Sequence, residues 1–167
     1  TRALSDVTKS KGGRYFTSSV GELNVVEKMK AENAVIGGEG NGGIIYPELH
    51  YGRDALVGIA LFLSLLTEKE IKVSTLKASY PKYAMSKAKV TLSGDMDVDE
   101  LFKQIKKKYK DKNLTTIDGV KIEFETTWVH LRKSNTEPII RVYTEAHNED
   151  AAYSLANKFV NEIKEFF

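Results

Sequence analysis

The sequence predicts an α/β half followed by an α+β half, and the pattern changes between them near Pro81. In the first half, apolar positions at helical spacing alternate with short strand-like runs, as in a partial βαβ arrangement. In the second half, strand-like runs are flanked by helices, which predicts a sheet with helices on one face. We therefore expect two domains, residues 1–79 and residues 80–167.

The first half carries two predicted helices and three short strands. Apolar residues recur at helical spacing over residues 19–32, and a more fully apolar helix over residues 54–66 is expected to pack against a sheet. The strand-like runs are residues 14–17, 34–36 and 44–46. The first residue is Thr1 and not methionine, so we expect the chain to be part of a longer protein.

The second half contains four strand-like runs and two helices. The strands are expected at residues 87–92, 121–124, 127–131 and 139–145, and the helices at residues 98–110 and 149–166. Before the first of these helices, SGDMDVDE carries three alternating aspartates, a pattern that could suggest a metal site. An EF-hand loop counted from Asp95 would, however, lack the glycine at its sixth position and the glutamate at its twelfth. We expect Asp95, Asp97 and Asp99 to cap and charge the start of that helix.

Composition narrows the classes of function. The 25 basic and 23 acidic residues leave a net charge of +2, which favours neither nucleic acid nor a membrane surface as a partner. There is no cysteine, and this excludes disulfides, thiolate metal sites and thiol catalysis. The longest apolar run is too short to span a bilayer and no signal peptide opens the chain, so the cytoplasm is the expected location.

Six lysines in KQIKKKYKDK, residues 103–112, support an alternative in which the second half binds nucleic acid. The same helix needs Leu101, Phe102, Ile105 and Tyr109 for its buried side, so the lysines are expected on a solvated face. The near-neutral total charge favours that interpretation.

The loop RKSNTEP, between two strand-like runs, gathers groups that bind phosphate. Arg132 can meet two phosphate oxygens with its planar fork of donors, and backbone N–H groups of a tight loop form an anion-binding concavity. Side-chain hydroxyls and an amide come from Ser134, Asn135 and Thr136. Only five of the 25 basic residues are arginine. An arginine in this loop therefore indicates that the planar arrangement of its donors is needed as well as its positive charge. An ordinary polar hairpin loop is the alternative.

A glycine-rich loop, GGEGNGG, lies between two apolar runs in the first half. Glu39 can accept two hydroxyl hydrogen bonds and Asn41 can both donate and accept, which suits the adjacent hydroxyls of a sugar. Glycine allows close approach of backbone to a ligand. A tight turn with two solvated polar side chains is the alternative, and the loop lacks the spacing of a nucleotide P-loop.

Together, in this order and about ninety residues apart, the two loops resemble the sugar-binding and phosphate-binding loops of the α-D-phosphohexomutases, the phosphoglucomutase/phosphomannomutase family. SSVGELNVVEKMK and YGRDALVGIALFLSLL resemble two helices of that family, and residues 117–146 resemble the strands around its phosphate loop. The chain departs from the family at Asn41, where members often have serine, and at Gly43, where some have histidine.

The resemblance implies that the chain is the C-terminal half of an isomerase of carbohydrate metabolism. Such an enzyme interconverts hexose 1-phosphate and hexose 6-phosphate by phosphotransfer, through a phosphoserine and a hexose 1,6-bisphosphate intermediate. Glu39 and Asn41 would bind sugar hydroxyls. The phosphate that is not reacting would be bound by Arg132, Ser134, Asn135 and Thr136.

The family's phosphoserine loop and its DGDxDR metal loop have no counterpart in this sequence. We therefore expect no catalytic residue and no metal ligand in this chain, and no mutase activity from it alone. Mg²⁺ would be held by N-terminal domains of the same protein. A non-catalytic sugar-phosphate-binding module remains the alternative, and the sequence does not separate glucose, mannose and glucosamine substrates.

Overall fold

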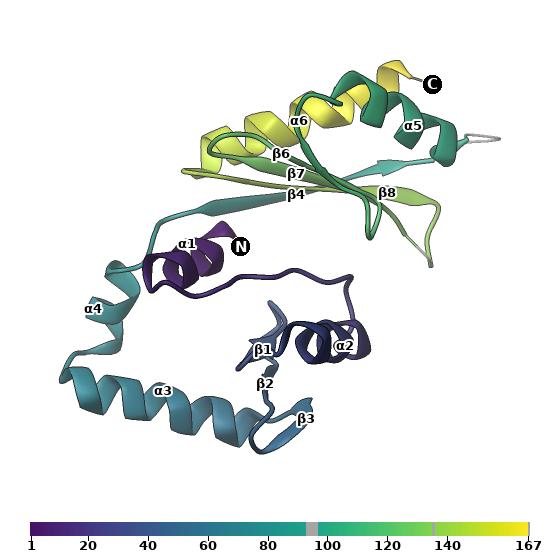
Figure 1. The fold of residues 1–167 in the computed structure, drawn as a ribbon. Coiled ribbons are helices and arrows are strands. Elements are labelled where there is room, and N and C mark those ends of the chain that lie inside the picture. Colours follow the sequence, from purple (N-terminus) through teal and green to yellow (C-terminus); the bar gives the residue numbers. More distant parts are fainter. Residues whose placement is uncertain (93–96, 135, 167) are drawn as a thin grey trace. The chain divides into compact units, whose positions relative to one another are not determined.

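A computed structural model describes residues 1–92, 97–134 and 136–166. The chain forms two compact units, of which unit 1 extends to Pro81 and unit 2 begins at Lys82, with Arg2 counted in unit 2 (Figure 1). Each unit has its own sheet and its own cluster of buried apolar side chains.

Unit 1 combines four helices with a small antiparallel sheet of order β1-β2-β3. Val26 and Met29 of the second helix pack with Ile45 of the central strand to form its buried cluster. The elements of unit 1 are α1 (Arg2–Ser10), α2 (Glu22–Glu32), β1 (Gly37–Gly38), β2 (Ile44–Tyr46), β3 (His50–Arg53), α3 (Ala55–Lys69) and α4 (Val73–Ala78).

The mixed α/β class is confirmed, but the strands of unit 1 differ in detail from the expectation. Residues 14–17, expected as a strand, are coil, and residues 34–36 form the approach to β1 rather than a strand. Among the described residues, no strand pairs with residues 14–17, and a strand needs a partner for its backbone groups. The strands that do form pair antiparallel, so this part of the unit shows no parallel βαβ pair.

Helix α3 begins at an N-cap, Asp54, whose Oδ1 accepts from Leu56 N at 2.9 Å and Val57 N at 3.0 Å. The bond from Val57 N–H, followed by the one from His50, lowers the pKa of Asp54. Gly58 lets the helix approach β2 closely, because a Cβ there would lie 3.0 Å from Ile44 Cγ1.

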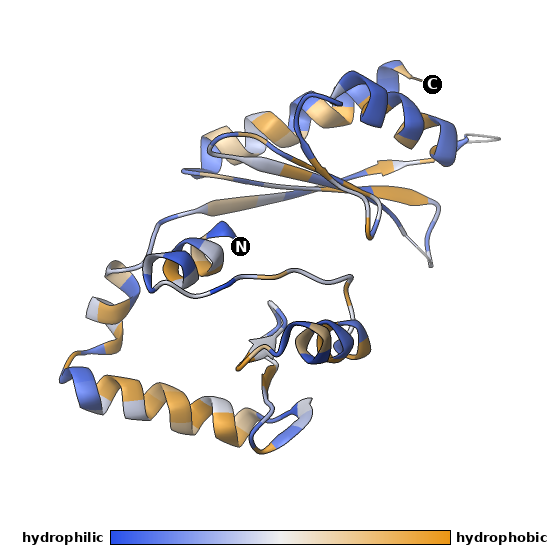
Figure 2. Ribbon diagram, viewed as in Figure 1, coloured by the Kyte–Doolittle hydropathy of each residue, from blue (hydrophilic) through white to orange (hydrophobic). Residues whose placement is uncertain are grey.

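Only the start of α3 packs against the sheet, although the sequence predicted this for the whole helix. Figure 2 shows apolar residues along much of its length, and several of them are exposed, including Leu56, Ile59, Phe62 and Leu63. The sheet is too small to cover the rest, since β2 has three residues and β1 two. A helix with apolar residues on most of its surface is typical of a buried position in a larger protein.

Unit 2 is an antiparallel sheet of five strands in the order β4-β8-β7-β6-β5, with α5 and α6 on one face (Figure 1). Its core lies between that face and the helices and includes Leu101, Ile105, Val142, Phe159 and Ile163. The elements are β4 (Ala84–Thr91), α5 (Val98–Lys108), β5 (Asn113–Thr115), β6 (Val120–Glu123), β7 (Trp128–Lys133), β8 (Ile139–Ala146) and α6 (Glu149–Glu165).

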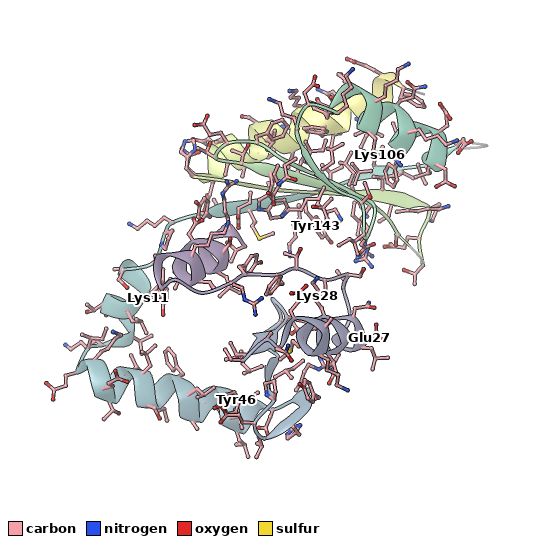
Figure 3. All side chains as sticks on the ribbon, in the orientation of Figure 1. Lys11, Glu27, Lys28, Tyr46, Lys106 and Tyr143 are labelled. Atoms are coloured by element: carbon pink, nitrogen blue, oxygen red, sulfur yellow. The ribbon has the colours of Figure 1, made fainter. Side chains whose placement is uncertain are left out.

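Helix α5 has the cap and the two faces that the sequence predicted. Asp97 is its N-cap, and its Oδ1 accepts from the backbone N of Asp99 and of Glu100, each at 3.0 Å. Asp95, expected to share this role, lies outside the described residues. Leu101 and Ile105 are buried, whereas Lys103, Lys107 and Lys108 are exposed. Lys106, labelled in Figure 3, is half-buried.

Candidate functional site

The glycine-rich loop is a tight hairpin between β1 and β2. Glu39 N donates to Gly43 O at 3.0 Å, and Gly43 N donates to Asn41 Oδ1 at 3.0 Å. Gly38 is required beside this turn, because a Cβ on it would lie 2.2 Å from Gly43 O. The hairpin thus brings the two predicted sugar-binding side chains, Glu39 and Asn41, onto one turn.

The Glu39 carboxylate is already held by the protein. Its Oε1 accepts from Gly21 N at 3.3 Å, and its Oε2 lies 4.0 Å from Arg53 Nη1. Arg53 is itself fixed by Glu22, whose Oε2 accepts from Arg53 Nε at 2.9 Å and whose Oε1 accepts from Arg53 N at 3.2 Å. Sequence reasoning missed Glu22 and Arg53, because the pairing joins the start of α2 to the end of β3.

A depression of about 570 Å³ opens beside this hairpin, within the range of small-molecule sites. Asn41 lies in its wall, and among the described residues its amide nitrogen has no hydrogen-bond partner, so it is able to donate to a ligand. Glu39 does not line the depression. The lining residues are Glu22, Asn41, Gly42, Gly43, Arg53 and Ala55.

The predicted phosphate loop connects β7 to β8 in unit 2. Arg132, near the end of β7, is paired through Nε with Asp118 Oδ1 at 3.1 Å. Ser134 is buried, and its backbone N donates to Ile139 O at 3.0 Å. Thr136 is exposed, whereas Asn135 lies outside the part of the chain that the structure describes.

A second arginine, Arg141, lies beside this loop. It pairs directly across the strands with Arg132, and its Nη2 donates to Ser134 Oγ at 3.3 Å. In the next strand Lys89 is its direct partner, so Lys89, Arg141 and Arg132 form a row of cations across β4, β8 and β7. Like charges placed directly opposite one another destabilise a sheet. This cation row therefore favours the binding of an anion.

The cation row lies on the sheet face that α5 and α6 leave open. Tyr143, two residues beyond Arg141 on β8, lies on that face in Figure 3, and alternate residues of a strand point to the same side. Sequence reasoning missed Arg141, because its position opposite Arg132 depends on the strand register of the β7–β8 hairpin. The phosphate-loop motif RKSNTEP ends at Pro138, three residues before Arg141.

Within residues 1–92, 97–134 and 136–166, no three His, Asp or Glu side chains gather in an arrangement that could hold a metal ion. In the same residues, none of the helices has the length and apolar character needed to cross a membrane.

The two compact units of this mixed α/β chain match two domain models of one protein family. Residues 1–83 match the model of phosphoglucomutase/phosphomannomutase alpha/beta/alpha domain III, and residues 87–162 match that of the phosphoglucomutase/phosphomannomutase C-terminal domain. The chain belongs to the phosphoglucomutase/phosphomannomutase family, as the resemblance of its loops implied.

Named relatives agree with this assignment. A phosphoglucosamine/phosphogalactosamine mutase of Sulfurisphaera tokodaii is 40% identical over 149 residues, which cover 88% of this chain and 32% of the relative. A phosphoglucomutase/phosphomannomutase of Thermococcus kodakarensis is 38% identical over 154 residues, covering 89% of this chain and 33% of the relative. The chain thus spans about a third of the length of these relatives.

A crystal structure of a phosphoglucomutase/phosphomannomutase family protein from Burkholderia thailandensis shares the fold. It superposes with a TM-score of 0.77 at 24% identity, over 99% of this chain and 35% of that one.

Proposed function

We propose that this chain is the substrate-positioning part of a phosphohexomutase that interconverts hexose 1-phosphate and hexose 6-phosphate. Membership of the family and the names of the two relatives, both mutases of phosphosugars, support this. The observation that carries the proposal is the arrangement of Arg132, Arg141 and Ser134, which offers two guanidinium groups and a hydroxyl to one anion.

In this proposal the loop after β7 binds the phosphate that is not reacting. Arg132 and Arg141 supply charged donors, and Ser134 and Thr136 supply hydroxyls, with Asn135 between them. The reaction passes through a phosphoserine and a bisphosphate, so the loop must accept either phosphate of the sugar in turn. Such positioning supplies much of the catalysis of phosphoryl transfer.

Glu39 and Asn41 bind sugar hydroxyls in the same proposal. Asn41 offers free amide donors at the depression, and Glu39 is an acceptor whose orientation is set by Gly21 and Arg53. Hydroxyls near the middle of the ring keep similar positions when the substrate turns over. One pair of side chains therefore serves both orientations of the substrate.

We assign the phosphoserine and the Mg²⁺ site to N-terminal domains of the same protein, since the family's phosphoserine loop and DGDxDR loop have no counterpart in this sequence. Mg²⁺ neutralises the phosphoryl group in transfer. A hexose 1,6-bisphosphate is the proposed activator, and the cytoplasm is the proposed location. The names of the relatives include hexose and hexosamine mutases, so the proposed substrate is the class of hexose phosphates.

These 167 residues alone are expected to show no turnover of hexose phosphate, even with Mg²⁺ and a bisphosphate activator present. The two loops position substrate, whereas the proposed nucleophile and metal ligands belong to other domains. A coupled assay of glucose 1-phosphate conversion to glucose 6-phosphate tests this on the purified chain. Turnover that is lost in an Arg132 variant would mean that a nucleophile lies within the chain.

In the full-length enzyme, Glu39→Ala is expected to weaken hexose-phosphate binding by about 1–3 kcal/mol, the cost of leaving hydroxyl donors unpaired. The affinity for inorganic phosphate should not change, because phosphate alone has no sugar hydroxyls to lose. Calorimetric titration of both ligands into both proteins measures this difference. Glu48→Ala is the control, since Glu48 is exposed and bonded to Tyr46 in the neighbouring turn. Equal loss of both ligands would contradict the separate roles of the loops.

A further inference from the structure

Asp118 contacts the arginine of the proposed phosphate site without being part of its loop. It lies in the turn between β5 and β6, and its Oδ1 is 3.1 Å from Arg132 Nε. Both side chains are only about a quarter exposed, at 27% for Asp118 and 26% for Arg132. Partial removal from water strengthens such a pair relative to one on the open surface.

The geometry of the contact leaves Arg132 able to bind an anion. Asp118 is reached through Nε, so the terminal Nη1 and Nη2 groups can still donate to two oxygens of a phosphate. A carboxylate on the Nε side restricts rotation of the planar guanidinium. The restriction sets the direction in which the fork of donors points.

The turn that carries Asp118 is itself fixed against β7. Gly119 has φ 72°, and a Cβ on it would lie 2.2 Å from Leu131 O and 3.1 Å from Arg132 Cα, so the two backbones are in close contact. The ring Nε2 of His130 also hydrogen-bonds to the backbone carbonyl of Asp118. The carboxylate is therefore presented to Arg132 by a rigid support.

The two arginines of the proposed phosphate site each lie next to a carboxylate. Arg132 is directly opposite Arg141 in the sheet, and like charges placed directly opposite one another are destabilising. Asp118 is the acidic side chain paired with Arg132, while Glu137 Oε2 lies 3.6 Å from Arg141 Nη2. Each arginine thus has one carboxylate at its side.

We propose that Asp118 is a positioning residue of the phosphate site, which holds the Arg132 guanidinium in the orientation that binds phosphate before the ligand arrives. The inference rests on the proposed function of the Arg132 loop. Asp118 comes from a different hairpin than the phosphate loop. It affects the affinity for phosphate only by orienting Arg132.

The test is a titration of the 167-residue chain with inorganic phosphate, followed by ¹H–¹⁵N NMR of the backbone and of the arginine Nε–Hε groups. Asp118→Asn is expected to raise the Kd for phosphate by about three- to tenfold, the effect of one modest interaction. Asp118→Glu, which keeps the charge, should recover part of the loss. Asp111→Asn is the matched control, because Asp111 is an exposed aspartate in the turn after α5.

A double-mutant comparison separates positioning from a general structural role. In an Arg132→Ala background, Asp118→Asn should cause no further change in the Kd for phosphate. Further weakening there, or an unchanged Kd for Asp118→Asn in the natural background, would overturn the positioning role. If Arg132→Ala itself left the Kd unchanged, the proposed function of the loop would fail instead.

A measurement on the unaltered chain covers the case in which the Asp118 variants do not fold. The Nε–Hε proton of Arg132 should exchange with water more slowly than that of Arg14, which is exposed, because the Arg132 side chain is only 26% exposed and its Nε lies 3.1 Å from Asp118 Oδ1. It should also shift when phosphate is added. Equal exchange rates for the two arginines would overturn the proposal without any substitution.

Discussion

Arg132→Lys is expected to lower the kcat/KM of the full-length enzyme by about 10- to 150-fold, corresponding to roughly 1.5–3 kcal/mol for a charge-assisted hydrogen bond. Lysine keeps the positive charge but has a single ammonium group in place of the planar fork, so it cannot meet two phosphate oxygens at once. It also lacks an Nε–H at the position that contacts Asp118. Steady-state kinetics with hexose 1-phosphate measures the loss.

Lys133→Gln provides the matched control for charge near the loop. Lys133 is exposed at the end of β7, and it follows Arg132, so it points to the opposite face of the sheet. Its loss should change kcat/KM far less than Arg132→Lys does. An unchanged kcat/KM for Arg132→Lys would remove Arg132 from the site.

The helices and most strands of unit 2 could be predicted because each has a strong periodic pattern. α5 and α6 have buried residues at helical spacing, and β6, β7 and β8 carry runs of β-branched and aromatic residues. β5 was missed because three residues at a sheet edge carry too short a pattern. A helix near the start of the chain, α1, was missed because its nine residues carry only three apolar side chains, Ala3, Leu4 and Val7, too few to show a helical repeat, and none of them is buried.

The residues of the candidate site, like the elements of the fold, were only partly predicted from the sequence. Its loops could be predicted because their chemistry is concentrated in a few consecutive residues. Arg141 and Asp118 could not be predicted, because their roles depend on their positions relative to Arg132. Those positions are set by the strand register and by a turn that packs closely against β7. Glu22 and Arg53 were missed for the same reason, since they meet only when α2 and β3 are folded. Local motifs identify ligand-binding groups, whereas the residues that orient those groups come from other elements.

Phe159 is expected to be the most sensitive core position of unit 2. It is fully buried on α6, and its ring lies 5.4 Å from that of Tyr109 and 6.4 Å from that of Phe124, measured between centroids. Burial, together with a hydrogen bond to Glu162, raises the pKa of Tyr109, so this ring stays neutral within the cluster. Phe159 belongs to the buried core between the sheet and the two helices, and Tyr109 and Phe124 pack against that core.

Phe159→Ala is expected to lower the free energy of unfolding of unit 2 by about 3–5 kcal/mol, because truncation leaves a cavity that the neighbouring rings cannot fill. Small domains have roughly 5–15 kcal/mol in total, so a substantial part of the stability of the unit would be lost. Urea unfolding followed by tryptophan fluorescence reports this directly, since Trp128, on β7, is the only tryptophan in the chain.

Two variants test whether the cavity is the cause. Phe159→Leu retains most of the volume and should cost less than half as much as Phe159→Ala. Tyr153→Ala removes an aromatic ring from the same helix at a position that is 63% exposed, and should change stability by no more than about 0.5 kcal/mol. If Phe159→Ala cost as little as Tyr153→Ala, the ring cluster would not be the core that holds α6 to the sheet. The cation row and the phosphate loop on the opposite face would then depend on some other support.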